Sequence, residues 1–166
     1  MLRRRLLLAT AAFGALSGCT AAVPVTAATA ATDPLCAQIV LATPTSLGDR
    51  LPQIPTTAQA TRAWGTASAP VVLRCGVTPP GPTTQRCVSV QTPGGPAVDW
   101  LVVPDDPAAG ASTADGGTGS WTFTAYGRVP AVEVHVPASV AASVSTSFLD
   151  QLGPAMSLAR KTRGCV

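Results

Sequence analysis

The chain has 166 residues, with 11 Lys and Arg against 8 Asp and Glu and a formal net charge of +3. Three of the basic residues, Arg3, Arg4 and Arg5, lie within the first eighteen residues, which contain no acidic residue. The remainder therefore has eight charges of each sign and is formally neutral. Nucleic-acid-binding proteins usually carry a basic surplus on one face, so this balance predicts no nucleic-acid partner.

The first nineteen residues have the parts of a lipoprotein signal peptide. The arginines precede an apolar run over residues 6–16. At about 1.5 Å per helical residue this run is too short for the ~30 Å hydrocarbon core of a bilayer, so it indicates a cleaved signal over residues 1–18 and no permanent transmembrane helix. The arginines suit either the general or the twin-arginine export route, and we favour the general one.

The signal ends in a lipobox, Leu16-Ser17-Gly18-Cys19. Small residues before the cysteine admit a peptidase, and the Cys19 thiol accepts the lipid. We expect cleavage before Cys19 and acyl chains, palmitate among them, on the new N-terminus. Several acyl chains give stable anchoring, so the protein is expected to be secreted and held on the extracytoplasmic face of the cell membrane.

The next segment lacks charge and apolar periodicity, which predicts a flexible Ala/Thr/Pro tether over residues 19–32. A single extracytoplasmic domain is expected over residues 33–166. Asp33-Pro34 is typical of a helix N-cap followed by proline in the first turn, and the helix is expected to reach about residue 42. Prolines interrupt residues 43–69, which we expect to be irregular with one helical turn near residues 59–63.

The middle of the chain has the composition of strands. Strands are predicted over residues 71–77, 85–90, 98–103, 120–126 and 131–136. The first two flank a proline-rich turn and are expected to pair as a hairpin. The Gly/Ala/Asp-rich loop over residues 104–119 is expected to be mobile at its tip.

The C-terminal segment has helical spacing interrupted by Gly153-Pro154. It predicts a helix of about ten residues before this break and a shorter turn after it. The expected fold is therefore α+β: a meandering antiparallel sheet of about five strands, with the N- and C-terminal helices packed on one face.

Four cysteines follow Cys19: Cys36, Cys75, Cys87 and Cys165. An even number outside the cytoplasm predicts two disulfides. Cys75 and Cys87 lie on the expected hairpin, so we predict that they pair and that Cys36 pairs with Cys165. Zinc sites usually contain a CxxC pair, which the sequence lacks, so neither a metal nor another cofactor is expected.

Residues suited to acid–base catalysis are few. His135 is the only histidine and Glu133 the only glutamate. On a strand both share the face opposite the neighbouring valines, so we expect them to face solvent. No Gly-x-Ser-x-Gly elbow supplies a nucleophile, and we expect no enzymatic activity. The alternative is a cell-envelope hydrolase that uses Glu133 and His135, or Asp99.

Aromatic and arginine side chains suggest a different kind of site, because exposed Trp, Tyr and Arg are frequent binding anchors. The sequence supports a hypothetical binding surface of Trp64, Arg74, Trp100, Tyr126 and Arg128. The alternative interpretation is that the tryptophans fill a small core while the arginines pair with carboxylates.

Several stretches, taken in order, resemble a known family. They are Trp64-Gly65, the segment 69–77 with its LRCGV motif, VDWLV at 98–102, YGRVPAVEV at 126–134, and the cysteines. Over residues 33–166 the chain is similar to the domain-of-unknown-function family DUF3515, small secreted proteins and lipoproteins of high-GC Gram-positive bacteria. The resemblance implies a compact extracytoplasmic domain with paired cysteines, but no activity and no functional residues. The loop near residues 105–119 departs from the family pattern, so no functional role is expected for it.

These features predict a membrane-anchored extracytoplasmic lipoprotein that acts as a non-catalytic binding or accessory module of the cell envelope. The expected partners are the membrane, through the lipid anchor, and an envelope protein or wall polymer whose identity the sequence leaves open. The hydrolase and a purely structural lipoprotein are the alternatives.

Overall fold

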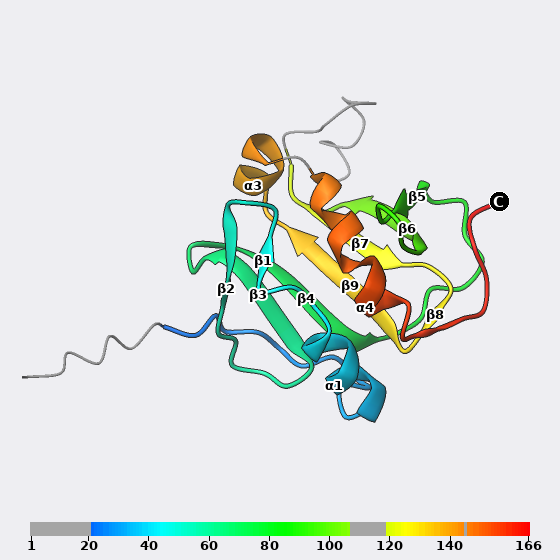
Figure 1. Ribbon diagram of the computed structural model, residues 1–166, viewed down its shortest axis with the longest axis horizontal. Coiled ribbons are helices and arrows are strands. Elements are labelled where there is room, and N and C mark those ends of the chain that lie inside the picture. The colour runs from blue at the N-terminus through cyan, green and yellow to red at the C-terminus, as the bar shows by residue number, and fades with distance from the viewer. Residues whose placement is uncertain (1–20, 107–118, 145) are drawn as a thin grey trace, which may run out of the picture.

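The computed structural model describes residues 21–106, 119–144 and 146–166. The predicted signal peptide, Cys19 and most of the Gly/Ala/Asp-rich loop lie outside these ranges. The described chain forms two layers, a large twisted antiparallel sheet and a layer of short helices on one of its faces (Figure 1). None of the described helices is long and apolar enough to cross a membrane.

Eight strands of the described chain form the main sheet, and all neighbouring pairs are antiparallel. They are β1 (Ser46–Leu47), β2 (Leu51–Ile54), β3 (Thr61–Thr66), β4 (Ala69–Val77), β5 (Cys87–Gln91), β6 (Ala97–Pro104), β7 (Trp121–Ala125) and β9 (Ala131–Val136). Their order, β1-β2-β3-β4-β9-β7-β6-β5, places β4 and β9 at the centre and β5 at one edge. A separate antiparallel pair joins β8 (Arg128–Val129) to β10 (Arg160–Lys161).

Side chains of Asp33 and Arg62 bind the backbone at the two ends of the first helix, α1 (Pro34–Leu41). The Asp33 carboxylate accepts a hydrogen bond from the Leu35 backbone N–H at 2.8 Å, which satisfies one of the free donors of the first turn. At the other end the Arg62 guanidinium donates to the Val40 carbonyl at 2.6 Å, a favourable position for a cation. Burial lowers the pKa of Arg62. The predicted N-terminal helix is confirmed.

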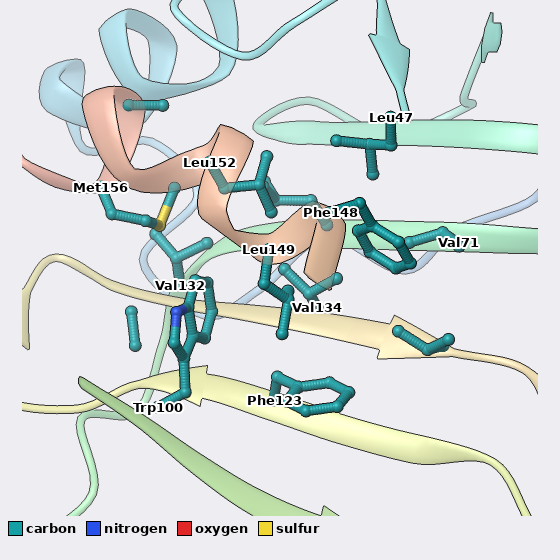
Figure 2. Packing of buried hydrophobic residues seen from close by; sticks show 14 of the residues in the cluster. Leu47, Val71, Trp100, Phe123, Val132, Val134, Phe148, Leu149, Leu152 and Met156 are labelled. Atoms are coloured by element: carbon teal, nitrogen blue, oxygen red, sulfur yellow. The ribbon is translucent and has the colours of Figure 1, made fainter. Parts of the chain in front are cut away.

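The core lies between the helices and the sheet. The C-terminal helical segments place large apolar side chains directly over the central strands (Figure 2). The helical layer contributes Phe148, Leu149, Leu152 and Met156, and the strands beneath it contribute Trp100, Phe123, Val132 and Val134. Full burial of one such side chain stabilises the fold by about 1.5–3 kcal/mol. This layer holds the sheet and the C-terminal helices together.

The α+β class is right, and the five predicted strands correspond to β4, β5, β6, β7 and β9. The strand count is wrong, because β1, β2 and β3 occupy residues 43–69, where we expected irregular chain and a helical turn. The prolines of this segment lie in or beside the two short strands at that side of the sheet, where a missing N–H is tolerated. Residues 61–66 instead pair with β4 along their whole length.

The predicted hairpin between residues 71–77 and 85–90 is also wrong. β4 pairs with β3 and β9, whereas β5 pairs with β6 at the edge of the sheet. Four strand-to-strand steps of about 4.8 Å separate β4 from β5, or roughly 19 Å. The proline-rich connection therefore carries the chain across the sheet and does not turn it back beside its predecessor.

This arrangement corrects the predicted disulfide pairing. Cys36 pairs with Cys75, with a Cα–Cα distance of 5.5 Å, and Cys87 pairs with Cys165, with a Cα–Cα distance of 5.8 Å. A disulfide needs Cα atoms within about 7 Å, so Cys75 and Cys87 cannot meet across the intervening strands. One bond ties α1 to a central strand, and the other ties the C-terminal segment to the edge strand.

The segment predicted to be a flexible tether is ordered against the sheet from Val23 onward, so that prediction is wrong for its described part. The Val23 N–H donates to the Pro55 carbonyl at 2.8 Å, and the Ala30 N–H donates to the Gly76 carbonyl at 2.9 Å. Val23 and Ala31 are buried. Small uncharged side chains let this segment approach the sheet closely, which composition alone does not distinguish from a linker.

The C-terminal helices also differ from expectation. In place of one ten-residue helix there are α3 (Ala138–Ser143), a 3-10 segment η1 (Thr146–Leu152) and α4 (Gly153–Met156). Gly153-Pro154 begins α4 and does not break a helix, because proline in a first turn loses no intrahelical hydrogen bond.

Candidate functional site

The predicted binding surface is wrong, because four of its five residues are buried. Trp64 and Trp100 are fully buried, and Tyr126 and Arg128 are each 8% exposed. The Trp64 indole N–H donates to the Pro44 carbonyl at 2.9 Å, and Arg128 donates to the Ala159 carbonyl at 3.0 Å. The C-terminal segment covers the Tyr126–Arg128 turn, where the Thr162 N–H bonds to the Gly127 carbonyl. These four side chains have structural roles.

Arg74 differs from the other four, because it lies on the outer face of the sheet, opposite the helices. It stands directly across from Glu133 of β9. Its Nε and Nη2 atoms lie 2.7 and 2.6 Å from Glu133 Oε1, and its Nη1 donates to the Thr26 carbonyl at 3.3 Å. Arg74 thereby joins two strands and fixes the N-terminal segment across the outer face.

A polar hollow of about 320 Å³ lies between this N-terminal segment and the sheet. Its lining residues are Ala27, Ala28, Thr29, Arg74, Val77, Thr78, Thr124 and Glu133. The N-terminal segment forms one wall, and β4, β7 and β9 contribute to the floor. Within the described residues, the hydroxyls of Thr29, Thr78 and Thr124 have no hydrogen-bond partner. The hollow therefore offers free hydroxyl groups around one internally neutralised ion pair.

The second polar group of the outer face is centred on Asp105. Its Oδ2 lies 2.8 Å from His135 Nε2, and its Oδ1 accepts a hydrogen bond from the Thr122 hydroxyl at 2.9 Å. The His135 and Asp105 side chains are 40% and 38% exposed. Glu133 and His135 share the outer face as predicted, with the neighbouring valines buried, but the Glu133 side chain is 21% exposed and only His135, at 40%, is open to solvent. The two residues are nevertheless bonded to different partners.

Asp99 belongs to a third group, at the C-terminal segment. Its Oδ2 lies 3.1 Å from Lys161 Nζ and accepts the Cys165 backbone N–H at 3.4 Å. Burial by itself raises the pKa of Asp99, but the hydrogen bonds from Lys161 and Ser89, the Lys161 charge and the Cys165 N–H together lower it below its usual value. The structure does not bring Asp99 into one site with Glu133 and His135.

In the part of the chain that the structure describes, no three or more His, Cys, Asp or Glu side chains are grouped as metal ligands. The floor of the hollow could be predicted in part from the sequence, because strict alternation in β7 and β9 places Thr124 on the same face of the sheet as Glu133. The wall at residues 27–29 was not, since an uncharged Ala/Thr segment has no pattern that predicts packing.

Comparison with known proteins gives one match. A family model described as "Protein of unknown function (DUF3515)" matches residues 6–161. No curated protein and no solved structure matches the chain. The family match includes the N-terminal segment that forms a wall of the hollow.

Proposed function

Since the chain belongs to the DUF3515 family, whose function is unknown, we propose a role from the arrangement of its own residues. The protein acts as a non-catalytic binding or accessory module of the cell envelope, anchored through lipid on Cys19 to the extracytoplasmic face of the membrane. The observation that carries the proposal is the hollow on the outer face, with three threonine side chains in its lining.

The hollow suits a neutral, hydrogen-bonding partner. Arg74 and Glu133 neutralise each other, so neither charge is free to attract a strongly charged ligand. The hydroxyls of Thr29, Thr78 and Thr124 can each donate and accept, which fits the hydroxyl and amide groups of a wall polymer or a protein loop. Each well-made hydrogen bond contributes about 0.5–1.5 kcal/mol, so a partner must engage several of them.

The paired state of the acidic and basic groups favours binding over catalysis. Glu133 is held by Arg74, and Asp99 is held by Lys161, whose hydrogen bond and charge help to lower the pKa of Asp99. Among the described residues, the one hydrogen-bond partner of His135 is the Asp105 carboxylate, and the hydroxyl of Thr122, on the neighbouring strand, donates to that same carboxylate. A general base needs the proton donor within hydrogen-bond reach.

The hydrogen-bonded N-terminal segment limits how far the domain can lie from a lipid on Cys19. Three residues, 20–22, separate Cys19 from the hydrogen-bonded Val23. At about 3.4 Å per extended residue, a lipid on Cys19 holds Val23 within about 14 Å of the anchor. The domain would therefore sit close to the membrane surface and not at the end of a long tether.

The anchor is tested by metabolic labelling of the full chain with an alkyne fatty acid, followed by membrane fractionation. The chain should take up label and remain in the membrane fraction, and Cys19→Ser should abolish both. Label retained by the Cys19→Ser variant would contradict lipidation at this residue.

The binding role is tested by crosslinking in the native envelope. Thr124→Val removes a hydroxyl from the floor of the hollow while keeping a β-branched side chain, and Thr66→Val makes the same change at an exposed strand end away from the hollow. Partner recovery should fall at least fivefold for Thr124→Val and stay unchanged for Thr66→Val. Equal recovery from both variants would refute the role of the hollow.

A further inference from the structure

Four exposed basic side chains lie in two segments that a disulfide joins. Arg160, Lys161 and Arg163 lie in and after β10, and Arg86 directly precedes the edge strand β5. The Cys87–Cys165 disulfide joins the segment that contains Arg86 to the C-terminal segment that contains the other three, more than seventy positions away in the sequence. We call this group of four residues the basic edge.

The basic edge has little internal neutralisation. Asp99 is the acidic residue paired there, with Lys161, whose side chain is still 51% exposed. Within the described chain, Arg86, Arg160 and Arg163 form neither an ion pair nor a side-chain hydrogen bond. The chain after residue 18 is neutral overall, so a local surplus of three positive charges leaves the remainder acidic by three. The even balance of the sequence conceals this separation of charge.

The basic edge lies far from the point where the described chain begins. In Figure 1 the first described residues, in blue, enter the fold at one end, whereas the C-terminal segment, in red, runs along the opposite end beside β5 and β6. If lipid on Cys19 holds the N-terminal end near the membrane, the basic edge faces away from the bilayer. This step rests on the anchoring part of the proposed function.

We propose that the basic edge binds a phosphate-bearing polyanionic polymer of the cell wall. Arginine is suited to this ligand because its planar guanidinium donates two parallel hydrogen bonds to one phosphate. Three unpaired arginines along one end can contact successive phosphates of a chain-like ligand. A lipid headgroup is disfavoured as the partner because the basic edge lies at the opposite end of the domain from the first described residues, which follow the proposed anchor.

The test uses the full chain in neutral detergent and long-chain inorganic polyphosphate as the probe. The triple variant Arg86→Gln, Arg160→Gln and Arg163→Gln removes the unpaired charges without touching the Lys161–Asp99 pair. Arg50→Gln is the matched control, because Arg50 is also exposed and forms no ion pair with any described residue, but it lies in the β1–β2 turn at the other side of the sheet. Thermal unfolding of all variants checks that folding is unaffected.

We expect the triple variant to lose at least tenfold in affinity and Arg50→Gln to bind like the parent. With about three phosphate contacts, raising salt from 50 to 200 mM should weaken parent binding about 20-fold. Equal binding by the triple variant and the parent would overturn the proposal. Binding to phosphatidylglycerol vesicles through the same arginines, without binding to polyphosphate, would overturn the choice of a polymer. Neither outcome depends on the threonines of the hollow or on Cys19 labelling, so failure here is distinct from failure of the proposed function.

Discussion

Cys36 in the first helix and Cys75 in a central strand are covalently joined, with their Cα atoms 5.5 Å apart and 39 positions apart in the sequence. The bond fixes α1 on the face of the sheet that carries the core. On the strand, Cys75 stands opposite Val132, a fully buried residue of β9. The disulfide is therefore part of the hydrophobic layer and not an external clamp.

Peptide mapping without reduction tests the disulfide pairing directly. Trypsin sites separate all four cysteines, at Arg74 and Arg86 among others, so each cysteine falls on its own peptide. We expect linked peptides that contain Cys36 with Cys75 and Cys87 with Cys165. A Cys75–Cys87 link would show that β5 is the neighbour of β4 and would contradict the strand order.

Removing either disulfide by paired Cys→Ala substitution should destabilise the domain strongly. The closed segments span 39 and 78 positions, for which chain-entropy arguments give about 4 kcal/mol each. Urea unfolding of each double variant, followed by intrinsic tryptophan fluorescence, measures the loss. A cost below about 1 kcal/mol would mean that the unfolded chain is restricted by other contacts.

Gly76 is required where the N-terminal segment crosses β4. Its φ is +91°, and an added Cβ would collide with the Ala30 carbonyl and lie 2.7 Å from the Ala31 nitrogen. Gly76→Ala should cost more than about 3 kcal/mol and expose the N-terminal segment to proteolysis. Gly48→Ala is the control, since Gly48 also has a positive φ but nothing lies within 4 Å of its added Cβ. It should cost only about 1–2 kcal/mol. Similar costs for both would show that the segment does not pack on Gly76.

Trp64 and Trp100 are both fully buried but differ in their indole N–H groups. Trp64 donates to the Pro44 carbonyl, whereas Trp100 Nε1 has no hydrogen-bond partner within the described residues. Replacement of each by Phe removes similar volume, but only Trp64→Phe breaks a hydrogen bond. Trp64→Phe should therefore be less stable by about 1 kcal/mol than Trp100→Phe in chemical denaturation. The reverse order would indicate that the Trp100 pocket is the more tightly packed.

Asp99 predicts a specific pH dependence of stability. Its pKa is lowered in the folded protein, so its contribution is present above the usual carboxyl pKa of about 4 and is lost as pH falls through the lower folded value. Asp99→Asn should reduce stability at pH 7 and flatten the decline below pH 4. Asp49 is exposed and forms no ion pair within the described residues, so it provides the control, and Asp49→Asn should leave the acid profile unchanged. Equal acid profiles for parent and Asp99→Asn would show that the Lys161 contact contributes nothing.

The sequence predicted those parts of the fold that local pattern decides. The Asp33 cap, the strict alternation in β7 and β9, and the outward position of Glu133 and His135 all follow from the spacing of neighbouring residues. Strands β1 to β3 were missed because proline and weak alternation conceal strands that depend on tertiary pairing: β3 pairs with β4, β2 with β3 and β1 with β2.

The candidate site shows the same division. Alternation alone predicts that Glu133 and Thr124 share a face of the sheet. The wall of the hollow comes from residues 27–29, and no local pattern connects these residues to the sheet. The binding surface expected from Trp64 and Arg128 failed because aromatic and arginine residues are equally suited to a core and to a surface, and burial depends on the whole fold.

By itself the sequence determined the helix and strand types of the regular segments, the even number of cysteines in the domain and the family. The lipid anchor is a prediction from the same sequence. These depend on interactions between residues that are close along the chain, or on motifs read in order. Tertiary structure alone decided the strand order, and through it the disulfide partners, the hollow and the basic edge. Those features join residues dozens of positions apart, and their proximity depends on how the whole sheet buries its apolar face.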